Sequence, residues 1–220
     1  MVLAPGREVI LLPKPYMDAV GQEVSGGPIP QIEALIHARR TTLPKRLQGP
    51  GPDSAQKERI LSAASAAPDH QQLLPWRLVE VPQGKRELLA QAFAQALLER
   101  DPLAQKEEIK QAREKAFRAP WLLLAICRTH DLAESTENPV PASERLVSLG
   151  CALQNMMLIC SALGLGSGLT SGKAMRSRAL RALFGLSDQE EAVCCLNIGH
   201  IRAPRENRER PSTEAFFSSL

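Results

Sequence analysis

Residues 143–172 read SERLVSLGCALQNMMLICSAL followed by GLGSGLTSG, and the contrast between these two halves decides the expected fold. The first half, 143–163, is mostly apolar over 21 residues, and this pattern predicts one long helix. Because both of its faces are apolar, we expect this helix at the centre of the protein or in a subunit interface. The second half, 164–172, is dense in glycine, and we expect a loop whose backbone N–H groups can approach a flat ligand closely. A flexible connection or a helix end would explain the same glycines equally well.

The segments around this stretch predict helices and strands in irregular alternation. Strands are expected at 76–81, where the pattern alternates, and at 121–127 and 192–198, where continuous apolar runs indicate burial on both faces. Helices are expected at 30–40, from Asp53 or Ser54 to Pro68, at 85–99, at 102–118 and at 176–184. This order favours an α+β fold with helices packed around a central sheet.

Composition and charge exclude several classes of function. The chain has 220 residues, a length that one domain can reach, and a net charge of only +3 without a concentrated basic face, so we expect no nucleic-acid partner. No window approaches the roughly 20 apolar residues that span a bilayer, so no membrane partner is expected. The four histidines show no paired spacing for a metal.

Five cysteines, an odd number without a C-x-x-C motif, indicate buried free thiols in a reducing compartment, which we take to be the cytoplasm. The adjacent Cys194 and Cys195 should point to opposite faces of a strand rather than form a redox pair. Residues 1–28 are punctuated by proline and glycine, with one possible short strand at 8–12, and we take them as an extension to a domain of residues 29–220.

Three segments could carry chemistry. The first is Arg39-Arg40-Thr41, followed by Arg46, because guanidinium groups and a hydroxyl at a helix end can bind one phosphate; a solvated basic helix end explains them as well. The second is the loop APDHQQLLPW at 67–76, whose His70 is equally typical of a surface residue. The third is the glycine-rich stretch at 164–172, which follows a helix and so differs from a dinucleotide-binding fingerprint.

The order of these segments resembles the FMN-dependent nitroreductase family. Arg-Arg-Thr is followed by Ala-Pro-Asp-His and Pro-Trp-Arg, then by Gly150-Cys151-Ala152, by Thr170-Ser171-Gly172 and by Asn197-Ile198-Gly199. The similarity covers about residues 30–205 and is greatest to the small, minimal nitroreductases with an A-P-D-H loop. It implies an α+β fold with a central mixed, mainly antiparallel sheet, in a homodimer with one FMN at each of two subunit interfaces.

By position, the resemblance implies that Arg39, Arg40 and Thr41, helped by Arg46, hold the phosphate and ribityl end. His70 would approach the flavin from the partner chain, and Leu169, Thr170, Ser171 and Gly172 would lie along the isoalloxazine ring. No catalytic side chain is assigned, since the flavin itself transfers the hydride. NAD(P)H would reduce FMN and leave, and a small organic acceptor such as a nitroaromatic or quinone would follow it in a ping-pong cycle.

The chain departs from its relatives at positions around the flavin. Leu169-Thr170 stands where Trp-Arg is usual, Ala66 replaces a basic residue, and Leu74 replaces a polar one. These losses favour an alternative, a degenerate family member that forms a dimer around another flat ligand without redox turnover. A specialised member that consumes or rearranges a flavin is a third hypothesis. The choice of NADH or NADPH and the physiological acceptor are not readable from the sequence.

Overall fold

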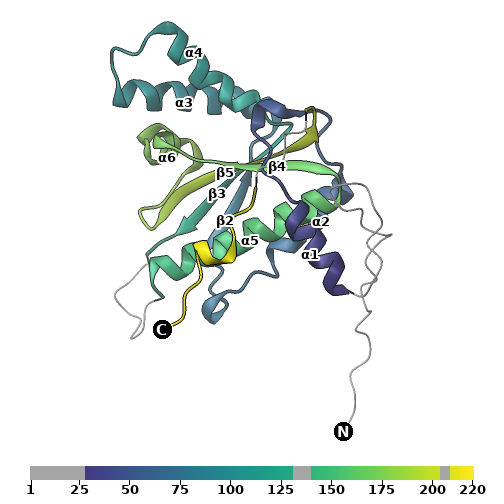
Figure 1. Ribbon diagram of the computed structural model, residues 1–220. Coiled ribbons are helices and arrows are strands. Elements are labelled where there is room, and N and C mark those ends of the chain that lie inside the picture. Colours follow the sequence, from purple (N-terminus) through teal and green to yellow (C-terminus); the bar gives the residue numbers. More distant parts are fainter. Residues whose placement is uncertain (1–27, 131–139, 204–208) are drawn as a thin grey trace.

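The computed structural model describes residues 28–130, 140–203 and 209–220 (Figure 1). Its helices are α1 (Pro28–Ala38), α2 (Ser54–Ala64), α3 (Arg86–Arg100), α4 (Lys106–Glu114), α5 (Ala142–Ala162) and α6 (Arg178–Phe184). Its strands are β1 (Leu47–Gln48), β2 (Trp76–Glu80), β3 (Trp121–Arg128), β4 (Leu165–Thr170) and β5 (Glu190–Ile201). Short 3₁₀ turns occur at Pro44–Arg46, His70–Gln72, Gln83–Lys85, Lys115–Phe117, Lys173–Arg176 and Thr213–Ala215.

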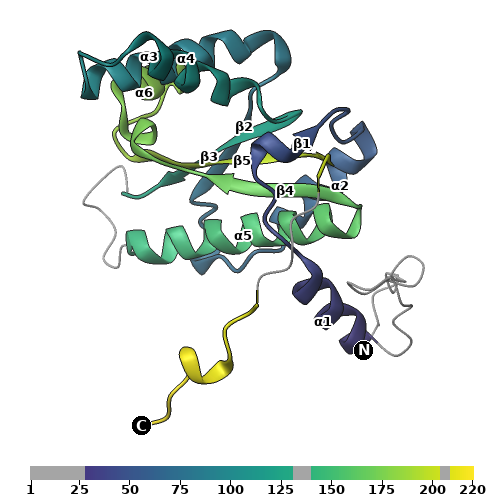
Figure 2. The same ribbon diagram turned by 45° about the horizontal axis from the view of Figure 1, so that its top comes forward.

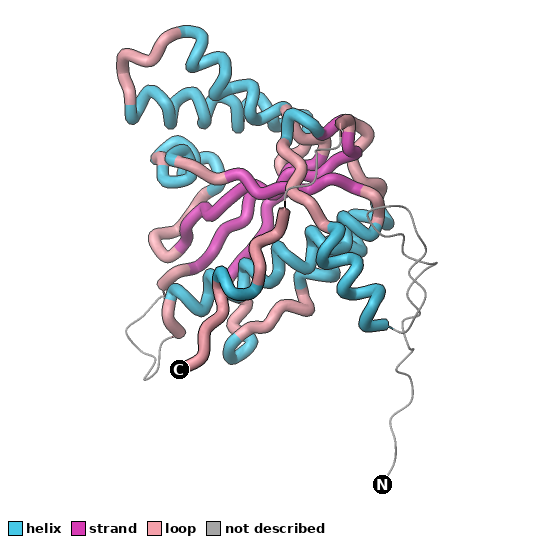
Figure 3. The backbone as a smooth tube through the Cα atoms, in the orientation of Figure 1, coloured by secondary structure: helices cyan, strands magenta, loops and turns pink. Residues whose placement is uncertain are grey.

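One sheet, drawn in magenta in Figure 3, holds all five strands. The long strand β5 pairs with β3 on one side and with β4 on the other, while β2 lies beyond β3 and the two-residue β1 pairs with the far end of β5. Every pairing between named strands is antiparallel. A parallel bridge joins Thr41 to Ser167 at the outer edge of β4. The expected α+β fold with a mainly antiparallel sheet is therefore confirmed.

Helices cover both faces of this sheet, with α5 and α2 on one face and α3, α4 and α6 on the other (Figure 2). Strand β3 shows why both layers form, because its first seven residues are all buried. Trp121, Leu123, Ala125 and Cys127 belong to the core beneath α5, and the alternate residues Leu122, Leu124 and Ile126 belong to the core beneath α3. Cys194 and Cys195 separate in the same way, and both are free thiols.

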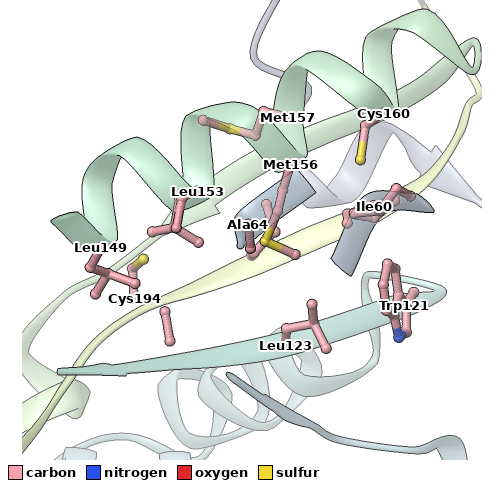
Figure 4. Close-up of a cluster of buried hydrophobic side chains, with 14 of the residues drawn as sticks. Ile60, Ala64, Trp121, Leu123, Leu149, Leu153, Met156, Met157, Cys160 and Cys194 are labelled. Carbon is pink, nitrogen blue, oxygen red and sulfur yellow. The ribbon is translucent and has the colours of Figure 1, made fainter. Parts of the chain in front are cut away.

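Helix α5 packs along the sheet through Leu149, Leu153, Met156 and Cys160, which face Leu123 and Cys194 in Figure 4. Their spacing of three or four residues makes a single buried stripe. On another part of the helix, Leu146 and Val147 are 40% and 65% exposed. By length and composition alone α5 could cross a membrane, so the expectation that no segment approaches that limit was too strict. Its packed stripe is that of a core helix.

The glycine-rich segment is the main correction to the expected secondary structure. Residues 165–170 form strand β4 rather than a loop. Close packing explains its glycines, since a Cβ at Gly168 would lie 2.5 Å from the carbonyl oxygen of Thr42 and one at Gly166 would lie 2.8 Å from Ile201 Cγ1. The strand forms because residues 165–170 pair with β5. The hydrophobic pattern of the sequence does not reveal this long-range pairing.

The other boundaries differ by a few residues. The helix that Asp53 caps, with a capping box to Gln56, ends at Ala64 rather than at Pro68. The predicted helix 102–118 begins only at Lys106 and tightens into a 3₁₀ turn from Lys115. The predicted strand at 8–12 and the rest of the N-terminal extension lie outside the described residues. The other predicted helices and strands are confirmed with ends shifted by up to three residues.

Candidate functional site

The site is organised by the segment that leaves α1, which passes along the edge of β4 (Figure 2). The Thr42 N–H donates to the Ser167 carbonyl oxygen at 2.8 Å, and Gly168 allows the Thr42 carbonyl to lie against the strand. The chain then turns at Pro44–Arg46 and enters β1. The start of this segment, at Arg39, and its end, at Lys45, are at most about 22 Å apart in extended chain. Residues 39–45 therefore connect two neighbouring features of the surface.

The first feature is an arginine cluster of Arg39, Arg40 and Arg210. The Arg40 Nη1 donates to the carbonyl oxygen of His37, in the last turn of α1, and Arg210 Nη2 donates to the carbonyl oxygen of Arg39 at 2.8 Å. Burial lowers the pKa of the Arg39 guanidinium, and the charges of Arg210 and Arg40 lower this pKa further. Arg39 nevertheless stays charged at neutral pH.

Arg39 gives the sharpest indication of a ligand. Its Nη1 is buried and has no hydrogen-bond partner within the described part of the chain. A buried donor without an acceptor costs about 1–3 kcal/mol, and more when it is charged. A phosphate would remove this cost, because it brings several acceptor oxygens and compensates the converging positive charges.

The second feature is a pocket with a volume of about 730 Å³ on the α3 side of the sheet. Its floor includes Leu122, Cys195 and Asn197 of the sheet, and its rim combines the 43–45 turn, the last turns of α3, α4 and residues 170–175. Apolar and polar groups both line it, as in sites for planar cofactors with a few orienting contacts. Burial raises the pKa of the Cys195 thiol to about 12, so this thiol is protonated at neutral pH and is no nucleophile.

The end of β4 also forms part of the pocket wall. The buried Asn197 donates from Nδ2 to Thr170 Oγ1 at 2.9 Å and to the Gly168 carbonyl oxygen at 3.2 Å, which fixes this end of the strand. Ser171 Oγ donates to the Val193 carbonyl oxygen at 2.8 Å. Gly172 has a φ of 146°, a conformation that residues with a side chain rarely adopt.

The structure brings most of the sequence-predicted residues into one region. Thr170, Ser171 and Gly172 line the pocket, Leu169 precedes them and is 41% exposed, and Arg39, Arg40 and Thr41 lie on the connecting segment. Arg46 belongs to the 44–46 turn, where its neighbour Lys45 rather than Arg46 lines the pocket.

His70 lies elsewhere within its own chain. Its Nδ1 is 2.5 Å from Glu144 Oε2, at the N-terminal end of α5, whereas β4 begins just after the C-terminal end of that helix. Helix α5 has 21 residues and is about 30 Å long, so His70 lies well away from the start of β4 in the same subunit. His70 of the same chain is therefore not among the residues that line the pocket.

Sequence reasoning missed two contributions to the site. Arg210 belongs to a basic tail far along the chain, and its place beside Arg39 follows from tertiary packing; the basic residues of that tail were its only signal. The pocket wall formed by α4 and the turn after it includes Glu108, Gln111 and Lys115, which the sequence presents as an ordinary charged helix face. Within the described residues, no three His, Cys, Asp or Glu side chains form a group that could hold a metal.

Comparison with known proteins agrees with this geometry. Residues 36–200 match the model of the nitroreductase family. The chain belongs to the nitroreductase family. A Haemophilus influenzae protein named "Putative NAD(P)H nitroreductase" is 31% identical over 75% of this chain and 85% of its own length. The matched range includes both the connecting segment and all of β4.

Solved structures of nitroreductases share the fold. A nitroreductase-like protein of Bacillus cereus superposes with a TM-score of 0.71 at 18% identity, over 86% of this chain and 95% of its own. A nitroreductase with bound FMN from Bacteroides fragilis superposes with a TM-score of 0.63 at 18% identity, over 86% and 98% of the two chains. At these identities the similarity establishes the nitroreductase fold.

Proposed function

We propose that this nitroreductase-family protein is an FMN-dependent oxidoreductase that uses NAD(P)H to reduce small organic acceptors such as nitroaromatics or quinones. The observation that carries the proposal is the buried, unpartnered Nη1 of Arg39 in the arginine cluster, joined by residues 39–45 to a pocket beside Thr170. The B. fragilis structure of the same fold holds FMN, and a relative of H. influenzae is named for NAD(P)H.

The residues present fit FMN at both of its ends. Arg39, Arg40, Thr41 and Arg210, with Arg46 nearby, would hold the phosphate and the ribityl end. Leu169, Thr170, Ser171 and Gly172 would lie along the ring, with Asn197 holding Thr170 in place. When bound, FMN supplies hydride transfer in two successive half-reactions, and the chain contributes orientation and the exclusion of water.

A homodimer would complete the site. Exposed apolar side chains on α1 and α5 lie on neighbouring helices, with Ile29, Ile32 and Val147 at 69%, 50% and 65% exposure. Such a patch is typical of a subunit interface. A second chain at this surface would bring its own His70 toward the pocket, as the resemblance implies. The free, mostly buried thiols agree with a cytoplasmic location.

An absorption titration tests the proposal. The purified protein is mixed with FMN, freed of unbound flavin, and reduced with NADPH or NADH under argon. Retained blue-absorbing flavin that bleaches on reduction and recovers with a nitroaromatic or quinone is the expected result. A protein that retains no FMN would contradict the proposal. It would support the alternative of a degenerate family member without redox turnover, which the presence of Leu169-Thr170 in place of Trp-Arg favours. Dependence on oxygen with loss of the flavin would support the flavin-consuming alternative.

A further inference from the structure

A set of basic side chains surrounds the pocket without serving the phosphate end of the site. We call it the basic rim, and it consists of Lys45, Arg100, Lys115, Arg118 and Lys173. These residues come from the 44–46 turn, the end of α3, the segment after α4 and the turn after β4. All five are exposed, and Glu108 is the acidic residue among the described residues that line the pocket.

The basic rim differs from two other cations of α4, Arg113 and Lys110, in lacking partners. Arg113 of α4 pairs with Glu87 of α3, and Lys110 lies 3.9 Å from Glu107. Within the described ranges, no rim side chain makes an ion pair or a hydrogen bond, and Glu108 is engaged in the capping box at the start of α4. Unpaired charges of one sign around a hollow focus a positive potential into it.

Bound FMN would leave most of this charge uncompensated. The phosphate has its own cations in the arginine cluster, and the ring is neutral when oxidised and carries at most one negative charge when reduced. Five rim cations against one rim carboxylate therefore exceed what the ring can balance. The surplus lies around the pocket where NAD(P)H, itself an anion, and the acceptor would dock in turn over the ring.

We propose that the physiological acceptor is an anion, a planar organic molecule that carries a carboxylate, sulfonate or phosphate and is held by the basic rim. The inference rests on the proposed function and names the substrate class of the same site. Exposed charges act mainly on encounter and orientation, so the preference should appear in kcat/KM and weaken as salt screens the rim.

The experiment compares two acceptors of matched shape, 4-nitrobenzoate and the neutral 4-nitrobenzamide. In a ping-pong cycle at saturating NADH, kcat/KM for the acceptor reports its own half-reaction alone. The ratio of the two kcat/KM values is measured in wild type, Arg100→Glu, Lys173→Glu and the control Lys85→Glu. Lys85 is exposed at the opposite end of α3 and does not line the pocket, so its substitution changes net charge equally.

We expect each rim variant to lower the benzoate-to-benzamide ratio about fivefold to tenfold, and Lys85→Glu to leave it within about twofold. Raising the ionic strength should lower the wild-type ratio toward that of the rim variants. The difference in intrinsic reactivity between the two acceptors is the same in every variant, so it cancels when the ratios of the variants are compared. A ratio that is unchanged in both rim variants would overturn the inference while leaving the proposed function intact.

Calorimetric titration of 4-nitrobenzoate separates failure of the inference from failure of the proposed function. We expect wild-type protein to bind the anion more tightly than either rim variant, whether or not FMN is present, and to bind 4-nitrobenzamide equally in all of them. Tighter anion binding without any FMN-dependent turnover would contradict the proposed function and keep the rim as an anion site. Equal anion binding in wild type and both rim variants would overturn the inference that the basic rim binds the acceptor.

Discussion

The arginine cluster and the basic rim are both positive, but they differ in how the chain assembles them and in how deeply they lie. Arg39 and Arg40 are adjacent in sequence, and one nitrogen of Arg39 is buried without a partner. The rim is collected from four separate segments, and all of its side chains are exposed. A converging set of donors with one buried member is suited to hold one cofactor permanently, whereas a fully exposed set suits a ligand that enters and leaves.

The largest effect should come from breaking the contact between Thr42 and Gly168 of β4, which holds the segment between the arginine cluster and the pocket against the sheet. In Gly168→Ala, the new Cβ would lie 2.5 Å from the Thr42 carbonyl oxygen, so the 41–42 segment must move off β4. We expect the free energy of unfolding to fall by about 3 kcal/mol and FMN binding to be lost. The control Gly84→Ala has no atom within 4 Å of its new Cβ and should change stability by less than about 0.5 kcal/mol. Urea unfolding of both variants measures the change in the free energy of unfolding. Equal midpoints would show that the close contact between Gly168 and Thr42 does not stabilise the fold.

Adding the cofactor should sharpen the comparison, since FMN relieves the repulsion in the arginine cluster and leaves the rim free. At 100 times its Kd, FMN should stabilise the folded protein by about 2.7 kcal/mol. For a chain of this size that corresponds to a rise in Tm of about 5–10 °C. Riboflavin, which lacks the phosphate, should raise Tm much less at the same concentration. Equal shifts for the two flavins in a thermal melt would show that the arginine cluster does not bind phosphate.

Arg39→Ala tests the arginine cluster without changing the basic rim. Loss of its charge-assisted bond should weaken FMN binding by about 1.5–3 kcal/mol, or roughly 10- to 150-fold, and should leave riboflavin affinity nearly unchanged. Arg59→Ala, at an exposed position of α2, serves as the matched control and should bind FMN as wild type does. Fluorescence titration of wild type and both variants with each flavin gives the six Kd values. A parallel loss of FMN and riboflavin affinity in Arg39→Ala would indicate misfolding instead of phosphate recognition.

The phosphate end and the ring end of the proposed FMN site also differ in how well the sequence predicts them. The burial of β3 on both faces follows from its apolar run, so this part of the fold could be predicted from the sequence. Arg39, Arg40 and Thr41 form a contiguous motif, so these candidate residues could be named from the sequence as well. The end of β4 was assigned to the site through its motif, although its secondary structure was mistaken for a loop. Its glycines reflect close contact with Thr42, a long-range feature that local propensity does not contain.

The basic rim and Arg210 were not predicted, for a related reason. Arg100, Lys115 and Lys173 each occur in a polar stretch where a charged residue is typical of a solvated surface. Only the packing of α3, α4 and the turn after β4 around one pocket gives them a common role. Arg210 likewise meets Arg39 from a position 171 residues later in the chain. Sequence patterns describe neighbours along the chain, so such convergences require the fold.

Arg210→Ala should give the smallest effect, because this side chain is exposed and would share the proposed phosphate with two other arginines. It donates to the Arg39 carbonyl oxygen at 2.8 Å and more weakly to that of His37 at 3.4 Å, so it also holds the C-terminal tail against the end of α1. We expect FMN affinity to fall about twofold to tenfold, with a loss that shrinks at high salt. Arg202→Ala, at an exposed position whose backbone N–H alone makes the local contact, is the control. Since Arg39 keeps its buried nitrogen in this variant, an effect as large as that of Arg39→Ala would mean that the tail, and not the buried arginine, dominates phosphate binding.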